Sequence, residues 1–181
     1  LHFDITQPKV AAWIKVLDPI LENSLRELGL TPQRDNGGLN DRLIESVTVL
    51  FDGSERPINR PLYDQKEYYS GKKAHTIKNN LMVNLIGEVL YLSPTYGGSF
   101  HDKKICDLEQ VEFLKETMVM MDLGYKGLEG GLAQIIMLHK RKKNQTLNAK
   151  QEQLNSWVSK IREKVEHVIA RIKIFKKVNK I

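Results

Sequence analysis

The sequence predicts a mixed α/β fold, a sheet flanked by helices, with a helical segment in front of it. Short apolar runs rich in β-branched residues alternate with longer stretches whose apolar residues recur at helical spacing. Their order along the chain is strand, strand, strand, helix, strand, short strand and helix, which favours a mixed sheet with helices packed against it. A length of 181 residues allows one domain with a sizeable core but not two large ones.

Residues 1–40 are predicted to form a helical adaptor. Pro19 is expected either to kink this helix or to divide it, and Gly29 provides a C-terminal stop. The turn-rich loop TPQRDNGGLND follows, so we assign the main domain to residues 41–181. The helix is indicated by apolar residues at the spacing of one helix face, namely Val10, Trp13, Ile14, Leu17, Leu21, Leu25 and Leu28.

The main domain begins with three predicted strands. The run ESVTVLFD is short and β-branched, and YYSGKKAHTIKNNLMVN and GEVLYLSPTYGG follow as two more strands joined near Ile86-Gly87. We expect these three to form an antiparallel meander. The later elements are a helix over HDKKICDLEQVEFL, strands over MVMMD and LAQIIML, the basic loop HKRKKNQTLNAK and a long final helix.

Charge is distributed unevenly along the chain. The whole sequence has 28 Lys and Arg against 22 acidic residues, whereas residues 140–181 alone carry 13 Lys and Arg against 3 Glu. This stretch has a net charge of +10, which leaves −4 for the preceding residues. A basic segment beside an acidic remainder is typical of proteins that bind polyanions, although solvated helices have a similar composition.

Cysteine content and hydropathy exclude several classes of protein. The single cysteine, Cys106, excludes an internal disulfide and a cysteine-based zinc cluster. No apolar run has the length of a membrane span, and the first residues do not form a signal peptide. We therefore expect a cytoplasmic protein.

Two aspartates follow predicted buried strands. Asp52 closes VTVLFD and Asp122 closes MVMMD, and each precedes a loop that contains glycine. Such a residue is either a turn cap or a site residue. Carboxylates at neighbouring strand ends repel each other unless a cation lies between them, so the pair is a candidate metal site.

The final helix offers a third carboxylate. Glu166 lies beside the apolar stripe formed by Val165, Val168, Ile169 and Ile172. Arg162 precedes it by four residues and Lys173 follows by seven, so all three point in roughly one direction. Ordinary exposed ion pairs would give the same spacing.

Further basic residues are candidate phosphate contacts. Lys72 and Lys73 are assigned to a strand. The simpler interpretation is that they lie on its solvent-exposed face, and the alternative is that they contact phosphate. His101 and Asp102 lie at a predicted helix start, where helix capping by Ser99 or Asp102 is the alternative to a site role. The basic loop residues, either solvated or bound to phosphate, are Lys140, Arg141, Lys142 and Lys143. We find no nucleophilic triad, Walker loop or dinucleotide fingerprint.

Together, five ordered blocks resemble DDE transposases of the bacterial insertion-sequence group five, relatives of the eukaryotic Harbinger transposases. The resemblance covers residues 45–177 and implies an RNase H-like fold, with Asp52, Asp122 and Glu166 as catalytic carboxylates. Glu163 is the near competitor, but the family pattern of Arg four before and Lys seven after the Glu selects Glu166. The blocks are FDGSERPINRP, YYSGKKAHT, GGSFHD, MDLGYKG and IREKVEHVIARIK.

The resemblance also implies a reaction and partners. Such enzymes cut double-stranded DNA at transposon ends with two Mg²⁺ or Mn²⁺ ions, and join the freed 3′ hydroxyl to target DNA. A homodimer on DNA and a location at the bacterial nucleoid are expected. Arg162 and Lys173 would position phosphates, and the remaining DNA contacts would be Lys72, Lys73, His101, Lys140, Arg141, Lys142 and Lys143.

The sequence also departs from the family pattern. Ser159 stands where related transposases often have Tyr. The helix-turn-helix expected to read transposon ends and the closing segment are both missing, so we expect a copy truncated at both ends. Two alternatives to an active catalytic domain follow, a non-catalytic DNA-binding remnant and a stand-alone RNase H-like nuclease.

Overall fold

The structure is a computed structural model. It describes residues 5–35, 39, 47–128, 134–141 and 146–174, and for residues 172–174 it describes the backbone only. The chain divides into two compact units, Leu1–Pro32 and Gln33–Ile181. The predicted domain boundary, between residues 40 and 41, falls outside the described residues. Gln33 already belongs to the second unit, where its N–H donates to the Leu90 carbonyl over 2.8 Å.

The first unit contains helix α1, Gln7–Glu27. A proline at the helix start is well tolerated because the first N–H groups have no partner within the helix. The helix runs through Pro19, so the expectation that Pro19 divides it is wrong. None of its residues is buried, and Trp13 remains 47 % exposed.

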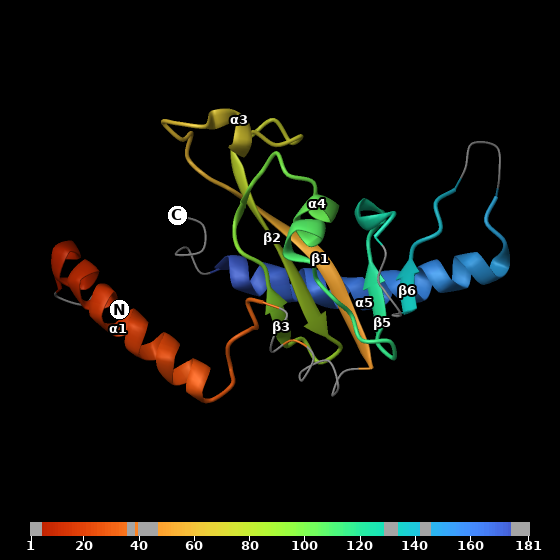
Figure 1. The fold of residues 1–181 in the computed structure, drawn as a ribbon, viewed down its shortest axis with the longest axis horizontal. Helices are drawn as coiled ribbons and strands as arrows, with labels where there is room; N and C mark the ends of the chain where they lie inside the picture. Colours follow the sequence, from red (N-terminus) through yellow and green to blue (C-terminus); the bar gives the residue numbers. More distant parts are fainter. Residues whose placement is uncertain (1–4, 36–38, 40–46, 129–133, 142–145, 175–181) are drawn as a thin grey trace. The chain divides into compact units, whose positions relative to one another are not determined.

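The second unit is built on a mixed sheet (Figure 1). Its strand order is β3-β2-β1-β5-β6, and β4 pairs with β2. Strands β1 to β3 form the predicted antiparallel meander, whereas β5 is parallel to β1 and β6 is parallel to β5. The prediction of a mixed α/β sheet is therefore confirmed. The strands are β1 Thr48–Pro57, β2 Thr76–Asn84, β3 Val89–Leu92, β4 Tyr96–Gly97, β5 Met118–Met121 and β6 Gln134–Met137.

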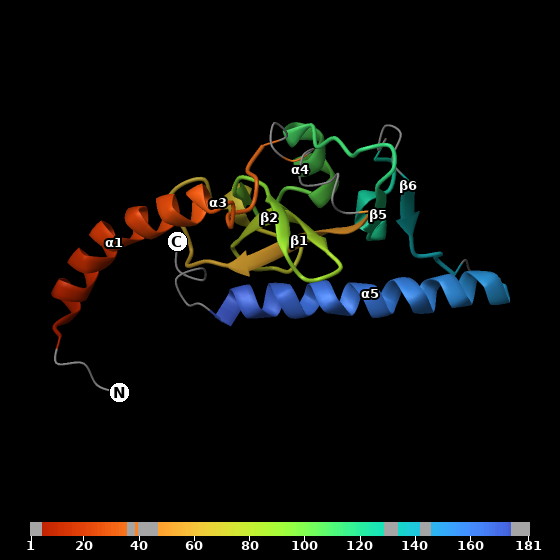
Figure 2. The ribbon, with the colours of Figure 1, turned by 90° about the horizontal axis from the view of Figure 1, so that it is seen from below.

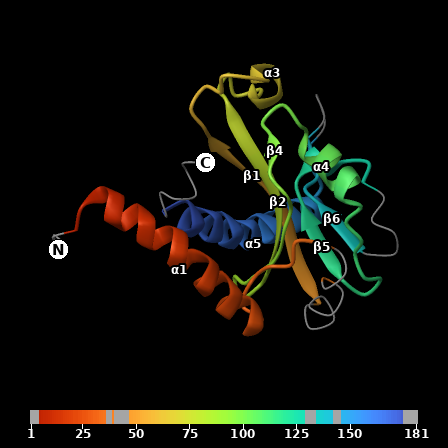
Figure 3. The same ribbon diagram turned by 60° about the vertical axis from the view of Figure 1, so that its left-hand side comes forward.

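Helices cover both faces of this sheet (Figure 2, Figure 3). Helix α4, Asp102–Glu109, lies against one face, and α5, Ala149–Ile174, crosses the other. We name these the α4 face and the α5 face. The predicted helix included VEFL at its end, but α4 stops before these residues because Gln110 adopts a left-handed conformation with φ 49°. Among its described residues the unit also has two short helices, α3 Gln65–Tyr68 and η1 Leu123–Tyr125.

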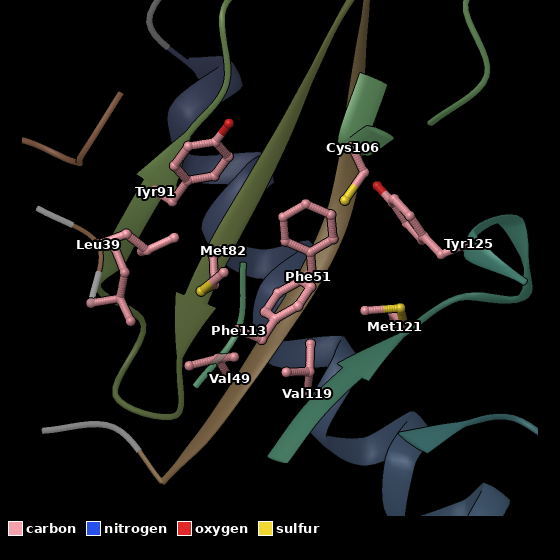
Figure 4. Packing of buried hydrophobic residues seen from close by; sticks show 11 residues of the cluster. Leu39, Val49, Phe51, Met82, Tyr91, Cys106, Phe113, Val119, Met121 and Tyr125 are labelled. Carbon is pink, nitrogen blue, oxygen red and sulfur yellow. The ribbon is translucent and has the colours of Figure 1, made fainter. Parts of the chain in front are cut away.

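The larger part of the core lies on the α4 face (Figure 4). Phe51 of β1 packs edge-on against Phe113 and Tyr125, with ring centroids 5.6 and 5.2 Å apart. Cys106 of α4 is buried in the same cluster, and burial raises the pKa of its thiol to about 12. This cysteine is therefore a packing residue rather than a nucleophile.

The pleat of the strands decides which side chains face α5. Phe51 and Met121 belong to the core of the α4 face, whereas Leu50 and Met120 pack with Val165 of α5 on the opposite face. Because successive side chains of a strand alternate between faces, the residue after Phe51 and the residue after Met121 both turn toward α5. These two residues are Asp52 and Asp122.

Candidate active site

Two neighbouring strands place Asp52 and Asp122 side by side. The parallel register of β1 and β5 ends at the pair Phe51 and Met121, so Asp52 is the next residue of β1 and Asp122 is the first residue after β5. Strand β1 continues to Pro57 in its pairing with β2, so the predicted turn directly after Asp52 is wrong. Asp52 is therefore a strand residue at the point where the parallel pairing stops.

Each aspartate is also fixed by its own backbone. Asp52 Oδ1 accepts a hydrogen bond from the Gly53 N–H over 2.8 Å, and Asp122 Oδ1 accepts one from the Leu123 N–H over 2.7 Å. Asp122 is thereby the N-cap of η1. The capping interpretation is correct for Asp122, and it leaves its second carboxylate oxygen available to the site.

Arg162 of α5 joins the two aspartates. Its Nη2 lies 3.6 Å from Asp52 Oδ2, and its Nη1 lies 3.3 Å from Asp122 Oδ1. Asp52 and Arg162 are largely buried, with 23 % and 21 % of their side chains exposed, whereas Asp122 is 46 % exposed. Val165, which is 2 % exposed and packs on the sheet, fixes the turn of α5 that carries Arg162. One guanidinium therefore offsets the repulsion between the two carboxylates.

The environment of Asp52 acts on its titration in both directions. Burial raises the pKa of Asp52, whereas the Gly53 N–H and the Arg162 charge lower it. The negative charges of Asp122 and Asp102 raise it further, and the net shift is upward from 3.8. A carboxyl whose charged form is disfavoured in this way gains from any additional cation beside it.

Glu166 lines the same pocket as the two aspartates. The pocket has a volume of about 660 Å³, and Glu163 is not part of its lining. The three predicted carboxylates therefore reach one pocket. Within the described residues, however, no three His, Cys, Asp or Glu side chains are arranged to hold a metal ion. The donor chemistry fits a hard divalent cation, because carboxylate oxygens are the ligands that Mg²⁺ prefers, but Arg162 lies where the two aspartates meet.

A second wall of the pocket was not predicted as a unit. It contains Glu55, Lys72, Lys78, His101 and Asp102. Sequence reasoning missed Glu55 and Lys78 because their proximity depends on the register between β1 and β2, in which Glu55 lies opposite Lys78. We name Glu55, Lys72, Lys78 and Asp102 the basic-acidic wall.

Glu55 is held in its ionised form within this wall. Its carboxylate accepts a hydrogen bond from Thr76 Oγ1 over 2.7 Å and lies 2.8 Å from Lys72 Nζ. Burial raises the pKa of Glu55, but hydrogen bonds from Lys72, Ser70 and Thr76 outweigh it and lower the pKa to about 2. Glu55 therefore stays charged and keeps Lys72 at the pocket.

Comparison with known proteins identifies the family. Residues 51–181 match the model of the DDE superfamily endonuclease family. This chain belongs to that family. The probable transposase for insertion sequence element IS702 of Microchaete diplosiphon is 31 % identical over 135 residues, which cover 70 % of this chain and 46 % of that protein. The chain thus spans about half the length of this curated relative. No solved structure matches the chain.

The other residues predicted as DNA contacts of a DDE endonuclease are dispersed. Lys72 and Lys73 lie in a turn, not on the predicted strand, because the Ser70 carbonyl accepts from the Lys73 N–H and Ser70 Oγ accepts from the Lys72 N–H. His101 is the N-cap of α4 without a side-chain capping bond, and it lines the pocket. Lys140 and Arg141 are exposed after β6 and lie outside the pocket lining.

Three of the predicted DNA contacts cannot be placed as side chains. Lys142 and Lys143 lie outside the described residues, and Lys173 is described by its backbone in α5 only. In the described part of this family member, no helix is long and apolar enough to cross a membrane.

Proposed function

We propose that this chain is the catalytic domain of a DDE transposase of bacterial insertion-sequence group five, related to the Harbinger transposases. It would cleave double-stranded DNA at transposon ends and join the freed strand to target DNA. The observation that carries the proposal is the pair Asp52 and Asp122 on adjacent strands, with Glu166 lining the same pocket. A meander extended by two parallel strands, with helices on both faces, supports an RNase H-like fold.

The three carboxylates Asp52, Asp122 and Glu166 would hold two divalent ions, Mg²⁺ or Mn²⁺. When bound, the ions would supply Lewis-acid stabilisation of the leaving oxygen and an activated water or 3′ hydroxyl. The DDE superfamily endonucleases generally use divalent metal ions, and the burial that raises the pKa of Asp52 supports a need for added positive charge at this point.

Arg162 has a specific place in this proposal. It now neutralises Asp52 and Asp122, and its guanidinium is suited to bidentate phosphate contact as well. We infer that Arg162 exchanges its carboxylate partners for a DNA phosphate when the site is loaded. The same residue would thus offset the repulsion between the carboxylates in the free protein and position the substrate in the complex.

Double-stranded DNA is the proposed partner, with a homodimer on transposon ends as the working assembly and the nucleoid as its location. The exposed Lys140 and Arg141 and the positive charge of residues 140–181 support backbone contact outside the pocket. Contacts of this kind hold DNA without reading its sequence.

Cleavage can be tested with the chain as it stands. Supercoiled plasmid is incubated with the protein in Mg²⁺ or Mn²⁺ and with EDTA, and nicked circles are measured. We expect nicking that requires the divalent ion and disappears in Asp52→Asn and Asp122→Asn, because an amide cannot replace the charge of a ligand carboxylate. Nicking that persists in both variants would exclude this site as its source.

A non-catalytic DNA-binding remnant is the second candidate. The observation that favours it is the occupation of the space between the aspartates by Arg162, together with the lack of a three-ligand metal group among the described residues. The two candidates differ in metal binding. If the chain is a remnant, the wild type, Asp52→Asn and Asp122→Asn should all bind DNA with the same affinity. None of the three should gain thermal stability from Mg²⁺ or Mn²⁺.

A further inference from the structure

We propose that the basic-acidic wall is a phosphate subsite in which Lys78 binds the DNA backbone and Asp102 is the group that Lys78 releases. The inference rests on the proposed function, because it needs a DNA strand in the pocket. It adds a contact residue that the motif blocks and the basic C-terminal stretch do not indicate.

The wall lies on the opposite side of β1 from the aspartate pair. Phe51 belongs to the α4 face, so Asp52 turns to the α5 face and Glu55 turns back to the α4 face. Lys78 lies opposite Glu55 on β2 and shares its face. The pairing of β1 with β5 ends at Phe51, so the pocket extends around this part of β1 and has one wall on each face.

Lys78 is a constrained cation. Only 15 % of its side chain is exposed, and its Nζ donates to the Phe100 carbonyl over 2.9 Å and lies 3.3 Å from Asp102 Oδ1. An ammonium group has three N–H donors, so these two partners leave one for a further acceptor. Placing a lysine this deep is costly unless it is paired. Because Lys78 lines the pocket, its remaining N–H donor can bind an anion there.

Asp102 is placed with similar precision. A Cβ atom on Gly53 would lie 2.9 Å from the Asp102 Cγ, so only glycine at position 53 allows the carboxylate to lie against β1. The start of α4 is held by Asn80 Nδ2, which donates to the Asp102 carbonyl over 2.9 Å. Tyr125 Oη in turn donates to Asn80 Oδ1 over 2.9 Å. Asp102 is therefore held close enough to Asp52 for its charge to help raise the pKa of Asp52.

The two ion pairs of the wall differ in how firmly each carboxylate is held. Each lysine of the wall has a carboxylate partner, Lys72 with Glu55 and Lys78 with Asp102. Glu55 is tied by several hydrogen bonds, whereas Asp102 is 35 % exposed and lies at the longer distance from its lysine. An incoming phosphate would therefore displace Asp102 rather than Glu55.

The test measures DNA affinity as a function of salt, with EDTA present so that no cleavage occurs. A labelled duplex oligonucleotide is titrated with wild-type chain, Lys78→Met, Lys78→Arg, Asp102→Asn and the control Lys115→Met. Lys115 is exposed and lies before β5, at the end of that strand away from Asp122. The melting temperature of each variant reports its folding.

We expect Lys78→Met to bind about tenfold more weakly, with a salt slope smaller by about 0.9 because one phosphate contact is lost. Lys78→Arg should keep the slope, and Lys115→Met should match the wild type. Asp102→Asn should bind more tightly than the wild type because it no longer competes for Lys78. Loss of folding alone cannot produce that gain.

An unchanged slope in Lys78→Met would overturn the inference and leave the proposed function standing. Equal weakening by Lys78→Met and Asp102→Asn, with equal loss of melting temperature, would also overturn it by showing a purely structural ion pair. If the wild type binds no DNA at all, the proposed function fails and this inference fails with it.

Discussion

Arg162 on α5 reaches Asp52 on β1, with 3.6 Å between Nη2 and Oδ2. The same guanidinium contacts Asp122 at 3.3 Å, so one cation serves two carboxylates from adjacent strands. Two carboxylates this close repel each other unless a positive charge lies near them. The stability and the metal affinity of the free protein should therefore both depend on Arg162.

Replacing Arg162 should destabilise the protein in a way that depends on pH. In Arg162→Met, the pKa of Asp52 loses a lowering influence and rises further above its ordinary value of 3.8. A carboxyl group whose pKa is higher in the folded than in the unfolded protein stabilises the fold most below its unfolded-state pKa. That contribution is lost as the pH rises through its folded-state pKa. We expect a loss of about 1 kcal/mol at pH 7 that shrinks toward pH 3, measured by urea unfolding. An equal loss at both pH values would show that Arg162 acts through packing alone.

Divalent metal should stabilise the wild type, and Arg162 should compete with it. We expect Mn²⁺ to raise the melting temperature of the wild type, and Asp52→Asn or Asp122→Asn to abolish the increment. Arg162→Met should show the increment at lower Mn²⁺ concentrations because the guanidinium no longer occupies the carboxylates. A higher Mn²⁺ requirement in Arg162→Met would contradict the exchange proposed for this residue.

Acid should weaken the basic-acidic wall through Glu55. Its pKa is about 2 in the folded protein against an ordinary value of 4.5. A depressed carboxyl pKa contributes stability that is present above the unfolded value and is lost as pH falls from 4.5 toward 2. We expect Glu55→Gln to remove on the order of 2 kcal/mol at pH 7 and much less at pH 2. The exposed control Glu112→Gln should leave the unfolding free energy unchanged at both pH values.

Two glycines beside the pocket provide a matched pair of substitutions. In Gly53→Ala, the new methyl group would lie 2.9 Å from Asp102 Cγ, so the carboxylate must move and strain its pair with Lys78. In Gly71→Ala, nothing lies within 4 Å of the new atom. We expect thermal unfolding to show a loss of about 1 kcal/mol for Gly53→Ala and a change below about 0.5 kcal/mol for Gly71→Ala. Equal stabilities would mean that Asp102 has room to move.

Local patterns in the sequence located the cores of the strands and the positions of the two aspartates next to them. Buried strands contain β-branched and apolar runs, and Asp52 and Asp122 interrupt such runs at corresponding positions. The extension of β1 to Pro57 was not predictable in this way. The residues DGSERP have the composition of a turn, and it is the ladder with β2, up to Pro57 opposite Thr76, that keeps them extended.

Long-range contacts account for the remaining errors. Helical periodicity placed Arg162 and Glu166 on one side of α5, but it could not show that Arg162 would bind both aspartates. Glu55 and Lys78 are 23 positions apart, and only the register of β1 with β2 brings them opposite each other. Lys72 was assigned to a strand because the hydrogen bonds that close the Ser70 turn leave no periodic signal.

The proposed catalytic site combines Asp52, Asp122 and Glu166, and Glu163 is the competing candidate for the third carboxylate. The most direct measurement is the initial rate of Mn²⁺-dependent plasmid nicking by Glu166→Gln and Glu163→Gln beside the wild type. Because Glu166 lines the pocket and Glu163 does not, we expect a loss of more than about a hundredfold for Glu166→Gln and a rate close to wild type for Glu163→Gln. Wild-type nicking in Glu166→Gln, with nicking lost in Glu163→Gln, would contradict the assignment of the third carboxylate.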